Sequence, residues 1–118
     1  GHPRGAGTFA RVLGRFVRED GKLTLMEAIG KMTIEPAKRL RQRTPMMANK
    51  GRIRIGADAD ITIFDPETVI DRATFDQPAL YSQGIEDVLV GGVPVVRQGK
   101  LDTARQPGEP IRAAIRQE

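Results

Sequence analysis

The chain has 118 residues, of which 39% are hydrophobic and 29% are charged, and its net charge is +4. This length suffices for one modest domain, and no apolar run approaches the ~20 residues needed to cross a bilayer. The sequence contains no cysteine, which excludes disulfides, thiolate nucleophiles and cysteine zinc sites. No stretch has the pattern of a secretory signal, so we expect a cytoplasmic location.

The basic character of the chain, with a pI near 10, raises the question of nucleic-acid binding. Arginines are spread along the chain among acidic residues, and aromatic residues, which stack on bases, make up only 4% of the sequence. A solvated surface, or an interface with a missing part of the protein, explains the charge better. We therefore expect no nucleic-acid partner and no membrane partner.

The first predicted element is an amphipathic helix from Phe9 to Glu19. Thr8 can cap its start, and Gly21 can adopt the left-handed conformation after its end. The apolar stripe has the helical spacing i, i+3, i+4, i+7 and i+8 and consists of Phe9, Val12, Leu13, Phe16 and Val17.

Two shorter helices are predicted next. The first opens with "TLME", in which Thr24 and Glu27 can form a reciprocal capping box. The segment "TIEPAKRL" predicts another helix, capped by Thr33. Pro36 would then lie in the first turn, where its missing N–H costs nothing.

A boundary is predicted in the polar segment 41–50, which Pro45 interrupts. Beyond it the apolar period changes from helical to two. We assign residues 1–48 to a helical segment and residues 49–118 to a β-structured part.

The β-structured part begins with two short apolar alternations. Ile53 and Ile55 alternate with arginines, and Ile61 and Ile63 flank a threonine. Each pattern predicts a half-buried strand.

The segment "IEDVLVGGVPVVRQGK" predicts a β-hairpin that turns on Gly91 and Gly92, because two adjacent glycines tolerate positive φ angles. The turn fixes a register that pairs Val90 with Val93, Leu89 with Pro94, Val88 with Val95, and Glu86 with Arg97. Pro94 lacks an N–H and is expected at an edge or beside a bulge. From Thr103 onward, prolines and scattered charge predict a tail whose order depends on a neighbouring surface.

Three aspartates in "KGRIRIGADADITIFDP" raise the question of a metal site: Asp58, Asp60 and Asp65. A calcium loop that begins at Asp58 would require glycine at its sixth position and glutamate at its twelfth. Those positions are Ile63 and Val69. The three carboxylates are therefore predicted to be structural groups at turns.

The chemical inventory of the chain contains one histidine, His2, which is expected to face solvent. Histidine-pair metal sites and histidine-dependent triads cannot be assembled from it. No phosphate-binding "GxxxxGK" motif is present either. We predict no catalytic residue, no metal ligand and no bound cofactor within this chain.

Five segments in this order resemble the C-terminal end of N-acyl-D-amino-acid deacylases, and together they cover nearly the whole chain. They are "HPRGAGTFARVLGRFVRE", "LTLMEAIGKMTIEPAKRL", "KGRIRIGADADITIFDP", "VIDRATF" and "GIEDVLVGGVPVVRQGK". These D-aminoacylase-like enzymes belong to the amidohydrolase superfamily and are sometimes called dihydroorotase-like. The third and fifth segments have counterparts across many amidohydrolases, whereas the first points to the deacylase branch.

The resemblance implies an α+β chain, in which short helices from the end of a metal-dependent (β/α)₈ barrel precede a small antiparallel β-sheet or sandwich portion. A complete barrel needs about 250 residues and cannot be contained here. The family's ligands for zinc or another divalent metal would lie upstream, so none is carried over. Arg4, in the loop near the barrel mouth, is the one candidate for a contact with the substrate carboxylate; the alternative is an arginine in solvent.

The implied function is hydrolysis of a C–N bond in an N-acyl-D-amino acid or a related cyclic amide, carried out by a parent enzyme. "RQRTPMMAN" is longer than the connection expected in the closest deacylases, which leaves the substrate branch open. The alternative is a free-standing basic module that binds nucleic acid or protein. We expect the isolated chain to be inactive and to self-associate through its helical stripe.

Overall fold

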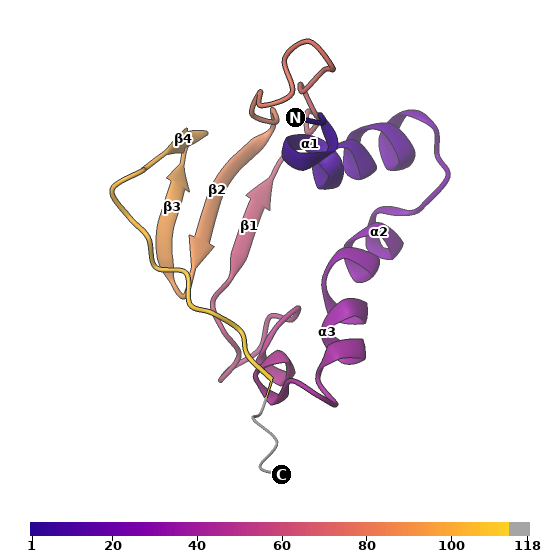
Figure 1. Ribbon diagram of the computed structural model, residues 1–118. Helices are drawn as coiled ribbons and strands as arrows, with labels where there is room; N and C mark the ends of the chain where they lie inside the picture. The colour runs from indigo at the N-terminus through magenta and orange to yellow at the C-terminus, as the bar shows by residue number, and fades with distance from the viewer. Residues whose placement is uncertain (114–118) are drawn as a thin grey trace.

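The computed structural model describes residues 1–113 as an α+β fold, in which a helical layer precedes a four-stranded antiparallel sheet with the order β1-β2-β3-β4 (Figure 1). This confirms the α+β class and the antiparallel sheet. No helix within residues 1–113 combines the length and the apolar character that a bilayer span requires.

The first helix is longer than predicted. It comprises α1 (Arg4–Arg11), which continues into the π-helical segment η1 (Val12–Glu19). The predicted cap at Thr8 is wrong, because the Thr8 hydroxyl donates to the carbonyl of Arg4 from within the helix. The predicted end is confirmed, and Gly21 has a φ of +59°.

The next two helices are α2 (Leu25–Met32) and α3 (Ile34–Leu40), followed by a 3₁₀ turn, η2 (Pro45–Asn49). The capping box of α2 is confirmed: Glu27 N donates to Thr24 Oγ1 over 3.2 Å, and Thr24 N donates to the Glu27 carboxylate over 2.8 Å. Thr33 is the N-cap residue of α3, as predicted, but its side chain makes no capping hydrogen bond. The Thr33 hydroxyl instead donates back to the carbonyl of Ile29 in α2, over 2.6 Å.

The strand predicted around Ile53 and Ile55 is absent from the described residues. Both side chains point into solvent, with relative exposures of 88% and 104%. The backbone bends at Gly51 and Gly56, which have φ angles of +69° and +84°. The alternation is present in the sequence, but within residues 1–113 this segment pairs with no strand, so neither isoleucine gains a sheet face to pack on.

The sheet consists of β1 (Ile61–Phe64), β2 (Ile85–Val90), β3 (Val93–Arg97) and β4 (Lys100–Leu101). The strand around Ile61 and Ile63 is confirmed. Ile61 is half-buried, as predicted, whereas Ile63 is 46% exposed. Beyond Leu101 no helix or strand forms as far as residue 113, and the rest of the predicted tail lies outside the described residues.

The hairpin between β2 and β3 turns where predicted, with φ angles of +56° at Gly91 and +80° at Gly92. The pairs nearest the turn, Val90 with Val93 and Leu89 with Pro94, are confirmed. A bulge between Val88 and Leu89 then shifts the register by one residue, so that Val88 faces Val96 and not Val95. The predicted pair of Glu86 with Arg97 depended on the unshifted register and is lost with it. The bulge lies beside Pro94, as its missing N–H led us to expect.

One small core joins the helices to the β-structured part. Its buried members are Ala10, Leu13, Ala28 and Val69, and half-buried Phe64 and Ile85 bring β1 and β2 against it. Val69 is the largest fully buried side chain among the described residues, and it belongs to the loop between β1 and β2.

Candidate functional site

The start of α1 and the loop after residue 70 lie side by side at one end of the molecule (Figure 1). They enclose a hollow of about 650 Å³. Its polar lining comes from His2, Arg4, Thr8, Arg11, Asp71 and Thr74. This hollow contains Arg4, the one site residue predicted from the sequence.

Arg4 is the first residue of α1, and its side chain is exposed. The backbone around it is held by two local bonds, because its N–H donates to His2 Nδ1 over 3.1 Å and its carbonyl accepts from Thr8. A rigid first turn thus carries a guanidinium, which can form two parallel hydrogen bonds to a carboxylate.

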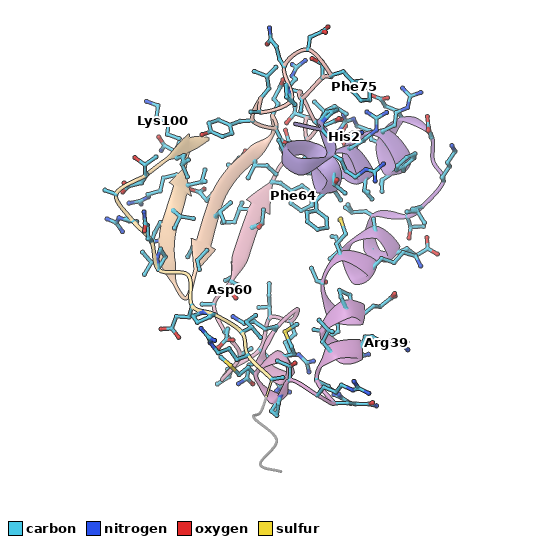
Figure 2. The ribbon with its side chains drawn as sticks, in the orientation of Figure 1. His2, Arg39, Asp60, Phe64, Phe75 and Lys100 are labelled. Carbon is cyan, nitrogen blue, oxygen red and sulfur yellow. The ribbon has the colours of Figure 1, made fainter. Side chains whose placement is uncertain are left out.

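His2 is exposed, as predicted, but it is not isolated. Its ring packs edge-to-face against Phe75, with centroids 5.2 Å apart and planes at 81° (Figure 2). The Nδ1 atom accepts the N–H of Arg4, so the imidazole helps to order the turn that carries the arginine.

Arg11 and Asp71 form an ion pair of 3.2 Å across the same hollow. The Asp71 side chain is only 11% exposed, whereas that of Arg11 is 56% exposed. The two residues are 60 positions apart. The sequence analysis did not identify this pair, because no local pattern connects an arginine inside a helix with an aspartate in a distant loop.

The aspartates near β1 are bound by donors of the chain itself. Lys50 Nζ lies 3.0 Å from the Asp58 carboxylate and 2.5 Å from that of Asp60. Asp60 also accepts the N–H of Gly91 at the hairpin turn, over 2.9 Å. Asp65 accepts hydrogen bonds from the N–H of Glu67 and from the hydroxyl of Thr68, which is typical of a turn.

These contacts change two pKa values. The Lys50 ammonium, and then the Gly91 N–H, stabilise the charged form of Asp60 and hold the pKa of that carboxyl below its usual range. The carboxylates of Asp60 and Asp58 in turn raise the pKa of the Lys50 ammonium above its usual value. Both shifts favour the charged forms of Lys50 and Asp60.

A second hollow, of about 520 Å³, separates the helices from β1. Its lining is mostly apolar and includes Phe9, Ile29, Met32, Ile53, Ile61 and Phe64. Arg52 also lines it, and its Nη2 atom is buried without a hydrogen-bond partner among residues 1–113. A buried guanidinium nitrogen without a partner is costly, so an acceptor from outside the described residues would stabilise this surface.

Carboxylates are the possible metal ligands of this part of the chain. Within residues 1–113, no three histidine, cysteine, aspartate or glutamate side chains lie close enough together to bind one ion. Asp58 and Asp60 face a lysine ammonium. The side chains of residues 1–113 therefore do not fit a catalytic divalent metal.

The model of the amidohydrolase family matches residues 2–96, which is most of the chain. The chain belongs to the amidohydrolase family. Among curated members, N-acyl-D-glutamate deacylase of Alcaligenes xylosoxydans xylosoxydans is 49% identical over 111 residues, covering 94% of this chain and 21% of that protein. D-aminoacylase of the same organism is 44% identical over 94 residues, covering 80% of this chain and 18% of its own length.

The amidohydrolase resemblance extends to three dimensions. The crystal structure of N-acyl-D-glutamate deacylase from Bordetella bronchiseptica, complexed with zinc and a phosphonate inhibitor that mimics the tetrahedral intermediate, superposes with a TM-score of 0.81. The two chains are 46% identical, and the match covers 95% of this chain and 22% of that one. The chain spans about a fifth of the length of the curated relatives it matches.

Proposed function

We propose that these 118 residues are the C-terminal part of a metal-dependent amidohydrolase that cleaves the amide bond of N-acyl-D-amino acids. The observation that carries this proposal is the identity of 49% with an N-acyl-D-glutamate deacylase along 94% of the chain. In this proposal residues 1–48 complete the barrel, and residues 49–118 are the C-terminal share of a small β domain. A cytoplasmic location stays a prediction from the sequence.

The surface of the chain supports a larger parent. Ile53 and Ile55 are almost wholly exposed although they alternate as in a half-buried strand. Phe9 is 65% exposed on a helix whose neighbouring residues are buried. Large apolar side chains grouped around a hollow with a buried, unpartnered arginine nitrogen are typical of a surface that another part of the protein covers.

The metal of the whole enzyme, zinc or another divalent ion, would be held by residues outside this chain, because the described residues do not fit it. When bound, such an ion activates water for attack on the amide carbonyl. The part assigned to this chain is binding and support. Arg4 is proposed to contact the substrate carboxylate; its exposed guanidinium in the first turn of α1 and the hollow beside it support this role.

The isolated chain is proposed to self-associate through the helical stripe, because Phe9 of that stripe is 65% exposed beside an apolar hollow. No observation favours the alternative of a free-standing module that binds nucleic acid or protein. The basic side chains among the described residues take part in several ion pairs with neighbouring carboxylates, as in Arg15 with Glu19 and Lys22 with Asp20.

The test is an activity assay on the longer polypeptide encoded by the reading frame that contains this chain. We expect it, loaded with zinc, to hydrolyse N-acyl-D-glutamate, N-acyl-D-aspartate or a neutral N-acyl-D-amino acid, and to leave the L-enantiomers intact. The 118-residue chain should be inactive on the same panel. A longer, metal-loaded polypeptide without turnover on any D-substrate would refute the deacylase proposal, and turnover by the 118-residue chain would refute its role as a supporting part.

The role of Arg4 is tested in the same assay. Arg4→Gln removes the charge and the paired donors, so KM should rise by about tenfold or more, as expected for a lost charge-assisted contact. Arg41→Gln, which removes the same charge from an exposed position after α3, is the matched control. Equal KM values for the two variants would remove Arg4 from the substrate site.

A further inference from the structure

The segment 66–75, called here the strap, runs along the first helix from its end to its start. At the end of the helix, Arg18 donates to the carbonyl of Pro66 over 3.0 Å and to that of Val69 over 2.7 Å. One turn earlier, the backbone of Gly14 touches the strap so closely that a Cβ there would lie 2.5 Å from the Val69 carbonyl oxygen and against Ile70.

The contacts continue toward the start of the helix in the same order. Arg11 pairs with Asp71, and a Cβ at Gly7 would lie 2.7 Å from the Cβ of Asp71. Finally, Phe75 packs against the ring of His2 (Figure 2). The strap runs antiparallel to the helix: later residues of the strap contact earlier residues of the helix. Contacts at five positions, from Arg18 back to His2, connect the two segments.

We propose that the strap positions the first turn of α1, with Asp71 as its positioning residue. This inference rests on the proposed role of Arg4 at the substrate site. The first turn of any helix has N–H groups without intrahelical partners, so its position depends on contacts from outside the helix. Here the turn is held from outside, because the strap pairs with the helix at Arg11 and packs Phe75 edge-to-face against His2, whose Nδ1 accepts the N–H of Arg4.

Asp71 is the decisive member because it combines two contacts. Its carboxylate is 11% exposed and faces the Arg11 guanidinium, and its Cβ lies in the space that the missing side chain of Gly7 leaves open. A largely buried carboxylate that loses its charge no longer holds the cation in place. The strap would then be free to leave the helix start, while Arg18 still secures its other end.

The first experiment observes the position of His2 without any activity measurement. His2 is the sole histidine in the sequence, so the 118-residue chain gives one set of imidazole NMR signals. Phe75 should displace these signals from their positions in a short peptide. We expect Asp71→Asn to abolish the displacement, although this residue does not touch His2, and Phe75→Leu to abolish it directly.

The control variant is Asp76→Asn, which removes the same charge from an exposed position of the same loop. It should leave the His2 signals unchanged. Val69 methyl signals report whether the core stays folded, and Arg11→Gln provides a second way to break the ion pair if Asp71→Asn unfolds the chain. Retention of the His2 displacement in folded Asp71→Asn or Arg11→Gln would overturn the strap.

The second experiment measures kinetics in the longer, metal-loaded polypeptide. Asp71→Asn should raise KM by about tenfold and leave kcat within about twofold, because a misplaced Arg4 weakens binding throughout the reaction. Arg11→Gln should have the same effect, and the double variant should be no worse than either single variant, since both remove one interaction. An unchanged KM would overturn the proposal; absence of deacylase activity in the unmodified enzyme would refute the proposed function instead, while the His2 signals would still decide the strap.

Discussion

The carboxylate of Asp60 connects two segments that the sequence separates by 31 positions, since it accepts the N–H of Gly91 and pairs with Lys50. In doing so it fixes the entry of β1 to the hairpin turn. The neighbouring Ala59 carbonyl adds a bond of 3.0 Å from the N–H of Gly92. Asp60, which the sequence predicted to be a turn residue at the start of a strand, thus also holds β1 against the hairpin turn.

The first prediction concerns the contribution of Asp60 to the stability of the chain at acidic pH. Because the folded-state pKa of Asp60 is lowered, its contribution to stability is present above the unfolded pKa of about 3.9 and is lost as pH falls through the lower folded value. Asp60→Asn keeps an acceptor for Gly91 but removes the charge. Between pH 5 and pH 2 the unmodified chain should therefore lose more stability than Asp60→Asn, by about 0.5 kcal/mol, because the 38% exposed side chain is partly screened by solvent.

The measurement is urea unfolding of both chains at several pH values. Asp76→Asn serves as the control, because it removes a carboxylate from an exposed loop. Parallel stability curves for the unmodified chain and Asp60→Asn below pH 4 would contradict the prediction.

The second prediction concerns Gly91, which has a φ of +56° and no heavy atom within 4 Å of the position of a Cβ. Strain in a variant would therefore come from the backbone alone. Gly91→Val should lower the free energy of unfolding by about 1–2 kcal/mol, and Gly91→Asn by less, because asparagine tolerates the left-handed region. Equal thermal midpoints for the valine variant and the unmodified chain would show that the turn does not constrain this residue.

Among single residues, those whose partners are close in sequence could be predicted. The capping box of Thr24 and Glu27 spans three positions, and the Gly91-Gly92 turn is defined by two. Thr8 and Thr33 have the same capping chemistry, yet their hydroxyls donate to carbonyls four residues earlier. A threonine hydroxyl can accept an N–H from the following turn or donate to a carbonyl of the preceding one, and the threonine alone does not predict which bond forms.

At the scale of elements, the first helix shows how tertiary contact overrides local preference. The apolar stripe and Thr8 predicted a start at Phe9, yet α1 begins at Arg4 and includes Gly5 and Gly7, which are poor helix formers. Gly7 and Gly14 are the positions where the strap approaches most closely. Residues that weaken a helix in isolation here allow it to pack.

The third prediction separates these two effects within one helix. A Cβ at Gly14 would lie 2.5 Å from the Val69 carbonyl oxygen, so Gly14→Ala should destabilise the chain by about 1–3 kcal/mol. Gly5 has nothing within 4 Å, and Gly5→Ala should stabilise the helix by about 0.5–1 kcal/mol. Urea unfolding checks both, and a stabilising Gly14→Ala would contradict the close packing.

The hairpin illustrates where element prediction stops. The glycines and the nearest pairs follow from the turn, but the bulge at Val88 and Leu89 changes every pair beyond it. One extra residue relieves the sheet beside Pro94, which cannot donate. The sequence indicated that an edge or a bulge was needed, whereas its exact place depended on how β2 also pairs with β1.

At the scale of the whole molecule, the described chain has few buried large side chains and many exposed ones. The prediction of a strand around Ile53 was wrong, because the alternation alone does not form a strand and this segment pairs with none within residues 1–113. Arg4 could be proposed from the resemblance of the "HPR" segment alone. Its support by Asp71 could not, since the partners of Asp71 lie 60 or more positions away.

The fourth prediction concerns self-association of the 118-residue chain. Phe9 is 65% exposed on the helical stripe and borders the apolar hollow. Phe9→Glu should shift sedimentation of the chain toward the monomer, because a charge in that surface opposes its burial. Ala6→Glu places the same charge on an exposed position of the same helix and should leave association unchanged. Identical sedimentation of the two variants would exclude the helical stripe as the contact.

The distance along the chain between the first helix and the strap has a consequence for synthesis. Val69, which accepts from Arg18, is 51 residues later than its donor. A ribosome that adds about 5–20 residues per second leaves the helix without this partner for roughly 3–10 s. During that interval the apolar face of the nascent helix is open to chaperones, and translation beyond Phe75 is the step that closes it.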